Sequence, residues 1–310
     1  MGPYLSAPIV AKESTEGAAG GVRYGATHMQ GWRNTMEDAH LTDLRVEGGA
    51  QVFGVFDGHG GKEVAIFAAR HFVSLLTQNS KYREGNYDTA LKETFLSVDT
   101  QLRTVEGAKE VFRIQRDLPD SASVDTNIAR DAVATAGCTA VVALITAGTL
   151  YVANAGDSRA VLGRKGRAVE MSQDHKPDLP EELARITGAG ACVVEGRVNG
   201  NINLSRSLGD LEYKTVQSLP AERQAVTAMP DVRSVVLTPE DDFLVMCCDG
   251  IWDILSSQEC VSFIHERLGQ KDLKTIAEEI CDRCLAHTTT EYEGRGCDNM
   301  TVVLVAFSPS

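Results

Sequence analysis

Short apolar runs rich in β-branched residues recur along the 310-residue chain and predict strands. Each run is too short to be a typical helix, and several are bounded by glycine or aspartate. Gly148 lies between two of the runs, which indicates a hairpin at 144–150. The predicted strands are 51–56, 139–145, 150–155, 159–162, 243–248 and 300–307.

Longer segments with apolar residues three and four positions apart predict helices. Ser256 and Glu259 have the spacing of a capping box at the start of one of them. Strands that come in groups, separated by helical segments, do not alternate as β-α-β units would. This order predicts an α+β fold of antiparallel sheets covered by helices. The predicted helices are 62–76, 87–104, 181–187, 257–268 and 273–287.

Three stretches lack either pattern. The first 20 or so residues are small, polar and rich in glycine, with Pro3 and Pro8, so 1–20 is predicted to be a flexible tail. Residues 21–310 continue without a linker and are predicted to form a single domain. Within it, 105–136 is expected to be an insertion or long loop, and 206–230 is a second irregular segment. Long loops in compact domains are often functional.

The overall composition limits the protein's location and partners. The hydrophobic share is 43%, no apolar run could cross a bilayer, and the N-terminus lacks the pattern of a secretory signal. We therefore expect a cytoplasmic protein with no transmembrane segment. The formal net charge of −13, from 43 acidic and 30 basic residues, argues against general nucleic-acid binding. The acidic excess is either ordinary surface charge or, in part, a metal site.

The eight cysteines are scattered, which fits a reducing compartment. Cys281 and Cys284 do form a C-x-x-C pair. Both also fall on an apolar stripe of helical spacing that begins at Leu273. A helix face directed at the core explains them without redox or zinc chemistry.

Acidic residues follow or precede the predicted core strands. Asp57 and Asp249 come directly after two of the strands, Asp157 lies just after a third, and Asp298 precedes the last. Each has a simpler explanation of its own: Asp-Gly is a common turn, Asp157 could pair with Arg159, and Asp298 could cap a loop. A carboxylate at the edge of a core strand is nevertheless unfavourable unless it is paired or binds a metal.

Together with Glu37 and Asp38, these acids indicate one convergent site. Carboxylates brought together repel each other unless cations lie between them. Oxygen ligands with few His or Cys residues nearby select hard ions such as Mg²⁺ or Mn²⁺.

The same acids belong to a series of motifs. The series resembles that of the metal-dependent (type 2C) Ser/Thr protein phosphatases, from about Val22 to the last predicted strand. Each motif is weak alone, but this many in one order is highly specific. The motifs are RYG at 23–25, MQGWRNTMEDAH at 29–40, VFDGHGG at 55–61, GCTAV at 137–141, ANAGDSR at 153–159, DHKP at 174–177, SRSLGD at 205–210, CDGIWD at 248–253 and DNMT at 298–301.

The resemblance implies a four-layer αββα sandwich, in which two antiparallel β-sheets pack face to face and are flanked by helix pairs. It also implies a metal site for two Mg²⁺ or Mn²⁺ ions and a third, weaker ion. Asp57 would bridge the two ions and Asp249 and Asp298 would complete one of them. Glu37 and the Gly58 carbonyl would hold the other. The predicted metal site also includes Asp38, and Asp157 and Asp253 match the ligands of the third ion.

The implied reaction is hydrolysis of phosphoserine and phosphothreonine in proteins by a water or hydroxide that bridges the two ions. Arg33 matches the family's phosphate-binding arginine, and its guanidinium suits two phosphate oxygens. No C-x₅-R nucleophile is present to form a phospho-enzyme. The leaving alkoxide needs a proton, for which His59 and His40 are candidates. His59 is favoured, because the matching family histidine acts as that acid.

Two alternatives use the same fold. One is a pseudophosphatase that binds without turnover, but such relatives lose metal-ligand aspartates that are present here. The other is a hydrolase of small phosphate esters or nucleotides, although no Walker loop is found. Comparing turnover of phosphopeptides and of nucleotides would distinguish a hydrolase of small phosphate esters from a protein phosphatase.

The N-terminus fits the myristoylation pattern at Gly2 and Ser6, while Pro3 departs from it. A single acyl chain would give only weak membrane association. We otherwise expect a monomer in the cytoplasm or nucleus.

Overall fold

A computed structural model describes residues 4–125, 134–290 and 294–307 of the chain. Most of its strands form two large sheets, in which every strand pair is antiparallel, and the remaining described strands form small sheets of two and three strands. The six-stranded sheet has the order β1 (Ile9–Ala19), β2 (Val22–Gly31), β16 (Met300–Phe307), β15 (Asp241–Cys247), β9 (Arg159–Arg164) and β10 (Arg167–Glu170). The five-stranded sheet has the order β14 (Asp231–Val236), β8 (Thr149–Ala155), β7 (Ala140–Thr146), β4 (Ala50–Phe56) and β3 (Ala39–Val46).

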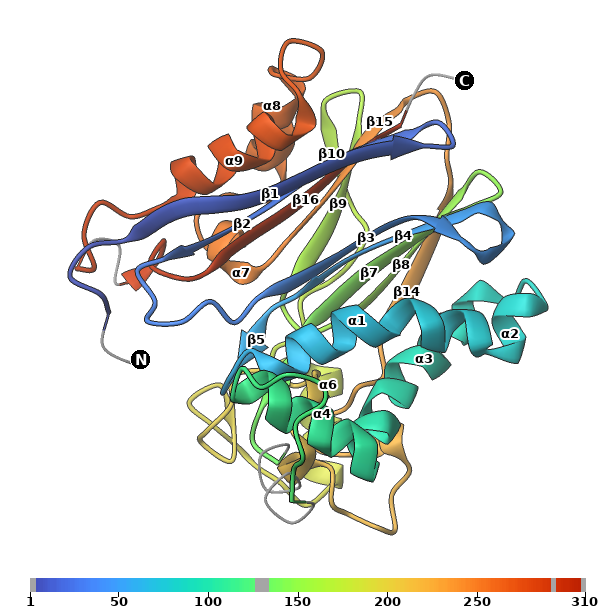
Figure 1. Cartoon of the computed structure of the whole chain (residues 1–310), viewed down its shortest axis with the longest axis vertical. Helices are drawn as coiled ribbons and strands as arrows, with labels where there is room; N and C mark the ends of the chain where they lie inside the picture. The colour runs from blue at the N-terminus through green and yellow to red at the C-terminus, as the bar shows by residue number, and fades with distance from the viewer. Residues whose placement is uncertain (1–3, 126–133, 291–293, 308–310) are drawn as a thin grey trace.

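Helices cover the outer face of each sheet (Figure 1). The helices α8 (Ser257–His265) and α9 (Leu273–Cys284) pack on the six-stranded sheet, and the short α7 (Asp249–Trp252) lies at its end. The five-stranded sheet is covered by α1 (Glu63–Gln78) and α3 (Tyr87–Leu102), with α2 (Ser80–Arg83) and α4 (Val105–Gln115) beside them. The predicted four-layer sandwich is confirmed.

The central strands are buried on both faces, which explains their continuous apolar runs. In β4, Phe53 and Val55 point into the core between the two sheets. Val52 and Phe56 point the other way and belong to the core beneath the helix layer that contains α1. Side chains alternate in direction along a strand, so both faces of such a strand must be apolar. The same alternation holds in β15, where Leu244 and Met246 face the sheet interface, and Val245 and Cys247 face α9.

The predicted helices and turns are confirmed with small changes at their ends. Ser256 and Glu259 form the capping box of α8 in both directions. The hairpin between β7 and β8 turns at Ala147 and Gly148, which have φ of 48° and 73°. Cys281 and Cys284 lie with Ile276 and Ile280 on the buried face of α9, as the apolar stripe predicted.

The prediction of a flexible tail was wrong for residues 9–19. They form β1, an edge strand that pairs with β2 through the turn at Gly20 and Gly21. Most side chains of β1 are at least partly exposed, so the strand carries no apolar pattern. The backbone hydrogen bonds with β2 explain why this segment forms a strand. Gly2 and Pro3, on which the acylation prediction rests, lie outside the described residues.

The prediction of a long loop at 105–136 was wrong for its first part. Residues 105–115 form α4, whose first turn is capped by Thr104: its hydroxyl accepts a hydrogen bond from the Gly107 amide at 3.0 Å. Val111 and Ile114 of α4 are buried against the layer that contains α1. Residues 126–133 are outside the described part.

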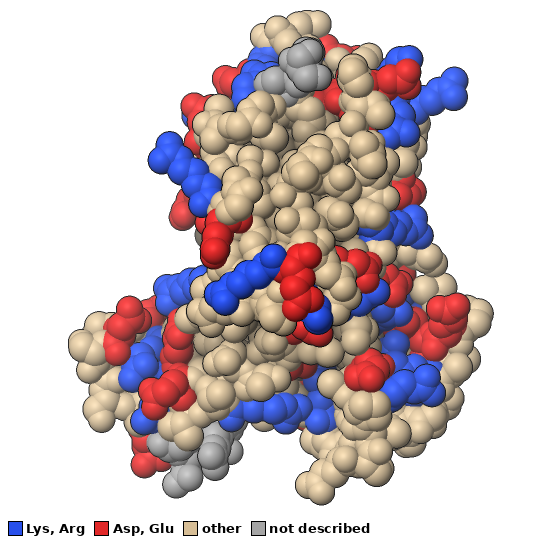
Figure 2. Space-filling view, turned by 90° about the vertical axis from the view of Figure 1, so that its right-hand side faces the viewer, with Lys and Arg blue, Asp and Glu red and all other residues tan. Residues whose placement is uncertain are grey.

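None of the described helices is long and apolar enough to span a membrane. On the face shown in Figure 2, acidic and basic side chains lie interspersed, and the central part of the upper half is largely uncharged.

Candidate metal centre

The two sheets bring the predicted acids to one end of the sandwich. Phe56, the last residue of β4, pairs with Ala39, the first residue of β3. Asp57 directly follows Phe56 and Asp38 directly precedes Ala39, so the two acids lie at the same edge of this sheet. In the other sheet Met300 of β16 pairs with Met29 of β2, which places Asp298 near the end of β2. Antiparallel pairing therefore brings residues far apart in the sequence to the same edge.

A cavity of about 400 Å³ opens at this edge. It gathers eight of the residues that the sequence singled out as catalytic, phosphate-binding or metal-binding. Asp38 and Asp253 do not line it: Asp38 is buried behind it, and Asp253 lines a neighbouring pocket of about 370 Å³. The eight are Arg33, Glu37, Asp57, Gly58, His59, Asp157, Asp249 and Asp298.

The carboxylates in the cavity act strongly on one another. Burial raises the pKa of Asp57 well above its usual value, and the charges of Asp38, Asp249, Asp298 and Asp157 raise it further. Burial likewise raises the pKa of Asp249, with Asp157 and Asp298 as the next largest causes. Such a cluster is stable in the ionised form only if cations balance it, which fits a metal centre.

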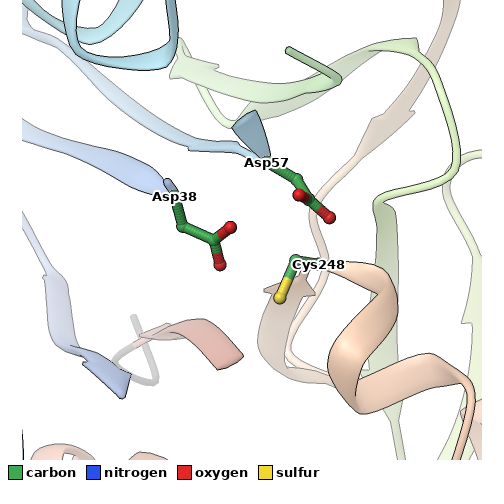
Figure 3. A group of neighbouring side chains, drawn as sticks. All are labelled: Asp38, Asp57 and Cys248. Atoms are coloured by element: carbon green, nitrogen blue, oxygen red, sulfur yellow. The ribbon is translucent and has the colours of Figure 1, made fainter. Parts of the chain in front are cut away.

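Asp38 contributes an oxygen with no hydrogen-bond partner. Its Oδ2 accepts a hydrogen bond from the Thr301 hydroxyl at 2.6 Å, whereas Oδ1 is buried and has none among the described residues. Burial raises the pKa of Asp38 to about 6, and Asp298 adds to the increase while the Thr301 bond opposes it. Ligand atoms of Asp38, Asp57 and Cys248 lie within 4.8 Å of one another (Figure 3). A buried carboxylate oxygen is unfavourable without a partner, and a cation is one partner that would satisfy it.

Cys248 does not change the expected type of metal. Its thiol contacts the Asn299 carbonyl at 3.5 Å and accepts from the Thr301 amide at 3.1 Å. Burial raises the pKa of this thiol well above its usual value, and Asp38 and Asp57 raise it further. A neutral thiol is a poor ligand, so the anionic donors are carboxylates, which suit Mg²⁺ and Mn²⁺.

Glu37 and Gly58 meet at one wall of the cavity. The Glu37 carboxylate accepts hydrogen bonds from the Thr35 hydroxyl at 2.8 Å and the Gly61 amide at 3.1 Å. A Cβ atom on Gly58 would lie 2.3 Å from the Glu37 carbonyl oxygen. Only glycine permits this approach, which leaves the Gly58 backbone beside the Glu37 side chain.

Arg33 reaches the cavity from the loop after β2. Its Nη2 donates to Asp298 Oδ2 at 2.6 Å, and 43% of the side chain is exposed. The Arg33 Nε is buried and has no hydrogen-bond partner among the described residues. Arg33 therefore keeps donors available for a ligand while one nitrogen contacts an acid of the metal site.

Asn299 organises this loop, a role that the sequence motifs did not reveal. Its side-chain amide donates to the carbonyls of Gln30 and Thr35 at 2.9 Å each, and its side-chain oxygen accepts from the Glu37 amide at 3.0 Å. One side chain thus fixes the backbone on both sides of Arg33. An asparagine beside Asp298 was the available signal, but its partners lie more than 260 positions away.

His59 is held by a buried acid that was not assigned a role from the sequence. Its Nε2 lies 2.8 Å from Asp210 Oδ2, and Asp210 is 2% exposed with a left-handed φ of 48°. The Ser207 hydroxyl also bonds to the Asp210 carboxylate. Burial lowers the pKa of His59, but Asp210 outweighs this and the net effect raises it.

His40 has a different environment. Its Nδ1 lies 3.4 Å from that of His28, and it does not line the cavity. Burial lowers the pKa of His40 to about 4, and His28 lowers it as well. Of the two candidate acids, the geometry favours His59.

Of the two acids predicted for a third ion, Asp157 lines the cavity and Asp253 lines the neighbouring pocket. Asp157 does not pair with Arg159, as had been considered. Arg159 instead forms two bonds with Asp174, at 2.9 and 2.7 Å, and the Lys176 ammonium bonds to Asp157. Burial raises the pKa of Asp253; Lys176 opposes the increase and Asp157 adds to it.

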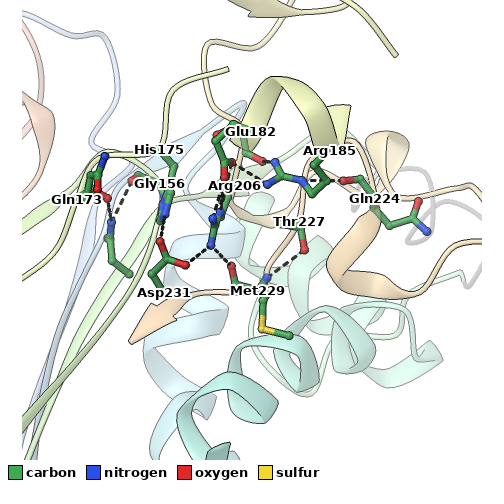
Figure 4. Close-up of polar contacts among 12 residues, drawn as sticks. Gly156, Gln173, His175, Glu182, Arg185, Arg206, Gln224, Thr227, Met229 and Asp231 are labelled. Atoms are coloured by element: carbon green, nitrogen blue, oxygen red, sulfur yellow. Dashed lines mark hydrogen bonds and ion pairs between the residues drawn. The ribbon is translucent and has the colours of Figure 1, made fainter. Parts of the chain in front are cut away.

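The irregular segment after α6 (Pro180–Gly188) is held by a second buried cluster of charges, drawn in Figure 4. Glu182 bonds to Arg185 at 2.8 Å and to Arg206 at 2.7 Å, and Arg206 also bonds to Asp231 at 2.8 Å. The arginines donate further to backbone carbonyls, including that of Gln224 at 3.1 Å. Burial raises the pKa of Glu182, but Arg206 and Arg185 outweigh it and lower the pKa to about 2.

The chain matches the family model described as Protein phosphatase 2C over residues 22–292. It is 49% identical over 308 residues to probable protein phosphatase 2C 6 of Paramecium tetraurelia, covering 99% of this chain and 100% of the relative. Protein phosphatase 2C 1 of the same organism is also 49% identical, with 98% of this chain and 99% of the relative covered.

Solved structures share the architecture. A phosphatase from a pathogenic strain of Toxoplasma gondii superposes with a TM-score of 0.75 at 25% identity, covering 97% of this chain and 96% of that one. A serine-threonine phosphatase 2C from Toxoplasma gondii gives a TM-score of 0.72 at 19% identity, with 98% of both chains covered, and shows the fold alone.

The sandwich and its acidic cavity define a metal-dependent hydrolase of phosphate esters. The chain belongs to the protein phosphatase 2C family. It is a metal-dependent protein phosphatase that acts on phosphoserine and phosphothreonine, the activity of that family.

Proposed function

We propose that the cavity binds two Mg²⁺ or Mn²⁺ ions that share Asp57 as a bridging ligand. The observation that carries the proposal is the position of Asp57: it is half-buried in the wall of the cavity, and four other aspartates of the site act on its charge. A carboxylate in the middle of other carboxylates can offer one oxygen to each of two ions. Asp249 and Asp298 would hold one ion, and Glu37 and the Gly58 carbonyl the other.

Asp38 is proposed to support the ion pair from behind. Its unpartnered Oδ1 can accept a hydrogen bond from water bound to an ion or contact the ion itself. Asp157 and Asp253 are proposed to hold a third, weaker ion at the side of the cavity.

The residues of the chain then orient the phosphate and the leaving group. When bound, the cations lower the pKa of water, which supplies a nucleophile near neutral pH. Arg33 is proposed to bind the phosphoryl oxygens through its free donors, which favours the transition state as charge moves onto those oxygens. No residue of the chain forms a covalent bond to phosphorus in this scheme.

His59 is proposed to donate the proton that the leaving serine or threonine alkoxide needs. Asp210 accepts a hydrogen bond from His59 Nε2 and so fixes the ring, and the proton given to the alkoxide comes from Nδ1 of the doubly protonated ring. The proposed partners are phosphoprotein substrates. The enzyme is proposed to act as a monomer in the cytoplasm or nucleus.

The test is phosphate release from a phosphothreonine peptide. Activity should disappear after chelation and return with Mn²⁺ or Mg²⁺, while a nucleotide monophosphate offered at the same concentration should be hydrolysed far more slowly. Full turnover by a chelated, metal-free sample would refute the proposal.

A further inference from the structure

A lysine of the chain lies where the proposed third ion would bind. The Lys176 ammonium bonds to Asp157 Oδ2, and the Asp157 side chain is 4% exposed. The same ammonium is close enough to act on the charges of Asp249 and Asp253. A positive charge from the chain is thus shared among acids at the side of the metal centre.

The backbone around Lys176 is fixed to the turn that carries Asp157. The His175 amide donates to the Gly156 carbonyl at 2.9 Å, and the Gly156 amide donates to His175 Nδ1 at 3.2 Å. The residue before a proline is held in an extended conformation, and Pro177 follows Lys176. These constraints fix where the Lys176 side chain begins.

Further contacts tie this segment to the buried charge cluster of Figure 4. His175 Nε2 lies 3.1 Å from Asp231 Oδ2, and Asp231 bonds to Arg206. The start of the Lys176 side chain is therefore part of a well-ordered network.

The side chain itself is not enclosed. It is 41% exposed, unlike the buried Asp157 carboxylate with which it pairs. A lysine ammonium is a compact charge on a flexible stem of four carbons. Lys176 can therefore turn toward solvent without moving its backbone.

We propose that the Lys176 ammonium competes with the third divalent cation for Asp157. It balances the charge of Asp157 when the ion is absent and leaves Asp157 when the ion binds. This inference rests on the proposed third ion. It explains in structural terms why that ion is the weak one: binding must first break the charge-assisted hydrogen bond to Asp157. Asp57, the proposed shared ligand of both tight ions, has no basic side chain bonded to it among the described residues, and of the side chains proposed for those ions only Asp298 has one, Arg33.

The first experiment measures Mn²⁺ binding by calorimetry and by the spin-resonance signal of free Mn²⁺. In Lys176→Met the dissociation constant of the weakest ion should fall at least about tenfold, the effect of removing one charge-assisted bond that the ion must displace. The affinity for the tight ions should change far less, since Lys176 acts on Asp249 only through its charge and is bonded to none of their proposed ligands among the described residues. Asp157→Asn should lose the weak ion in both backgrounds.

Lys165→Met is the matched control. Lys165 also pairs with an acid, Glu240 at 2.7 Å, but on the surface at the far end of β9, with 67% of its side chain exposed. Its loss changes the net charge by the same amount. The affinity for the weak ion should stay within about twofold, because an exposed charge at that distance is screened.

Two outcomes overturn the inference in different ways. If the weak ion is present but its affinity is the same in Lys176→Met, only the role of Lys176 is wrong. If no third ion binds to any variant while two tight ions do, the third-ion proposal fails together with the inference. The two-ion centre stands in either case.

A second experiment uses the unmutated protein. An amine-reactive ester followed by mass spectrometry reports how available each lysine is. Raising Mg²⁺ from a concentration that fills the tight sites to one that fills the weak site should increase the labelling of Lys176 severalfold, with Lys165 unchanged. Equal labelling of Lys176 at both concentrations would contradict the inference.

Discussion

Two clusters of acids, each with buried members, lie in this molecule, and they differ in what balances their charge. In the metal centre, burial and neighbouring acids raise the pKa of Asp57 and Asp249 well above the usual value. In the cluster beside α6, two arginines lower the pKa of Glu182 to about 2. Glu182 and Asp231 there face Arg185 and Arg206, so two negative charges meet two positive ones.

The difference separates a site from a structural element. A buried carboxylate with its own arginine already has its charge balanced and needs no ion from solution. A buried carboxylate surrounded by other carboxylates must take up either protons or cations from solution. Burial of an acid alone does not distinguish the two cases, whereas the sign of its neighbours does.

Asp57→Asn should have the largest effect. It removes the charge of the proposed bridging ligand and one of its two oxygens, so turnover of a phosphothreonine peptide should fall on the order of 10³-fold or more. The metal-free variant should be at least as stable to heat as the parent, because an unbalanced buried charge is gone. Survival of activity with loss of one ion would show that Asp57 is not the bridge.

Glu182→Gln should do the opposite. It leaves Arg185 and Arg206 buried without their shared carboxylate, and the free energy of unfolding should fall by about 3–5 kcal/mol. Urea denaturation measures this change. Mn²⁺ binding by the folded fraction should be retained, and a loss of both stability and metal binding would mean that the two clusters are not independent.

The acids of the metal site could be predicted from the sequence, whereas the side chains that pair with its residues could not. Asp57 and Asp249 directly follow apolar strands, and a strand followed by an acid is a local pattern. The pairing of His59 with Asp210, or of Lys176 with Asp157, joins polar residues across 151 and 19 positions. No periodicity marks such contacts.

The fold shows the same limit. Strands buried on both faces, such as β4 and β15, could be predicted from the sequence because their apolar runs are continuous. The edge strand β1 was missed because its order comes from backbone pairing with β2, which leaves its side chains free to be polar. The Gly20-Gly21 pair at its end was the available signal, since such pairs favour tight hairpin turns.

Arg33→Ala should have a smaller effect than either change above. Loss of the proposed guanidinium contact should lower kcat/KM by a factor that corresponds to about 2–3 kcal/mol of transition-state stabilisation. Product inhibition by phosphate should weaken in parallel. Thermal stability and metal affinity should hardly change, because the pair with Asp298 is half exposed. Arg33→Lys is the matched control, since it keeps the charge and loses the planar fork. Normal phosphate inhibition with lowered stability would indicate a structural arginine instead.

The two clusters should also respond to pH in opposite directions. The pKa of Glu182 is lowered to about 2 in the fold from 4.5, so its contribution is complete above pH 4.5 and is lost as pH falls toward 2. The pKa of Asp38 is raised to about 6 from 3.8, so the metal-free protein should gain stability as pH falls from 6 to 4. Thermal unfolding across this range measures both. Saturating Mg²⁺ should abolish the second trend and leave the first, and Glu182→Gln should abolish the first.

The central claim is that the unbalanced acids bind cations, and counting the ions tests it most directly. Equilibrium dialysis of the chelated protein against Mn²⁺ at pH 7 should give two tightly bound ions per chain. Calorimetry in buffers of different ionisation enthalpy should show that binding releases more protons as the pH is lowered, since the cavity raises the pKa of Asp57 and of Asp249 well above the usual value. Asp57→Asn should lose both ions, while Glu182→Gln should keep them. A parent protein that takes up no Mn²⁺ at concentrations supporting full turnover would contradict the account.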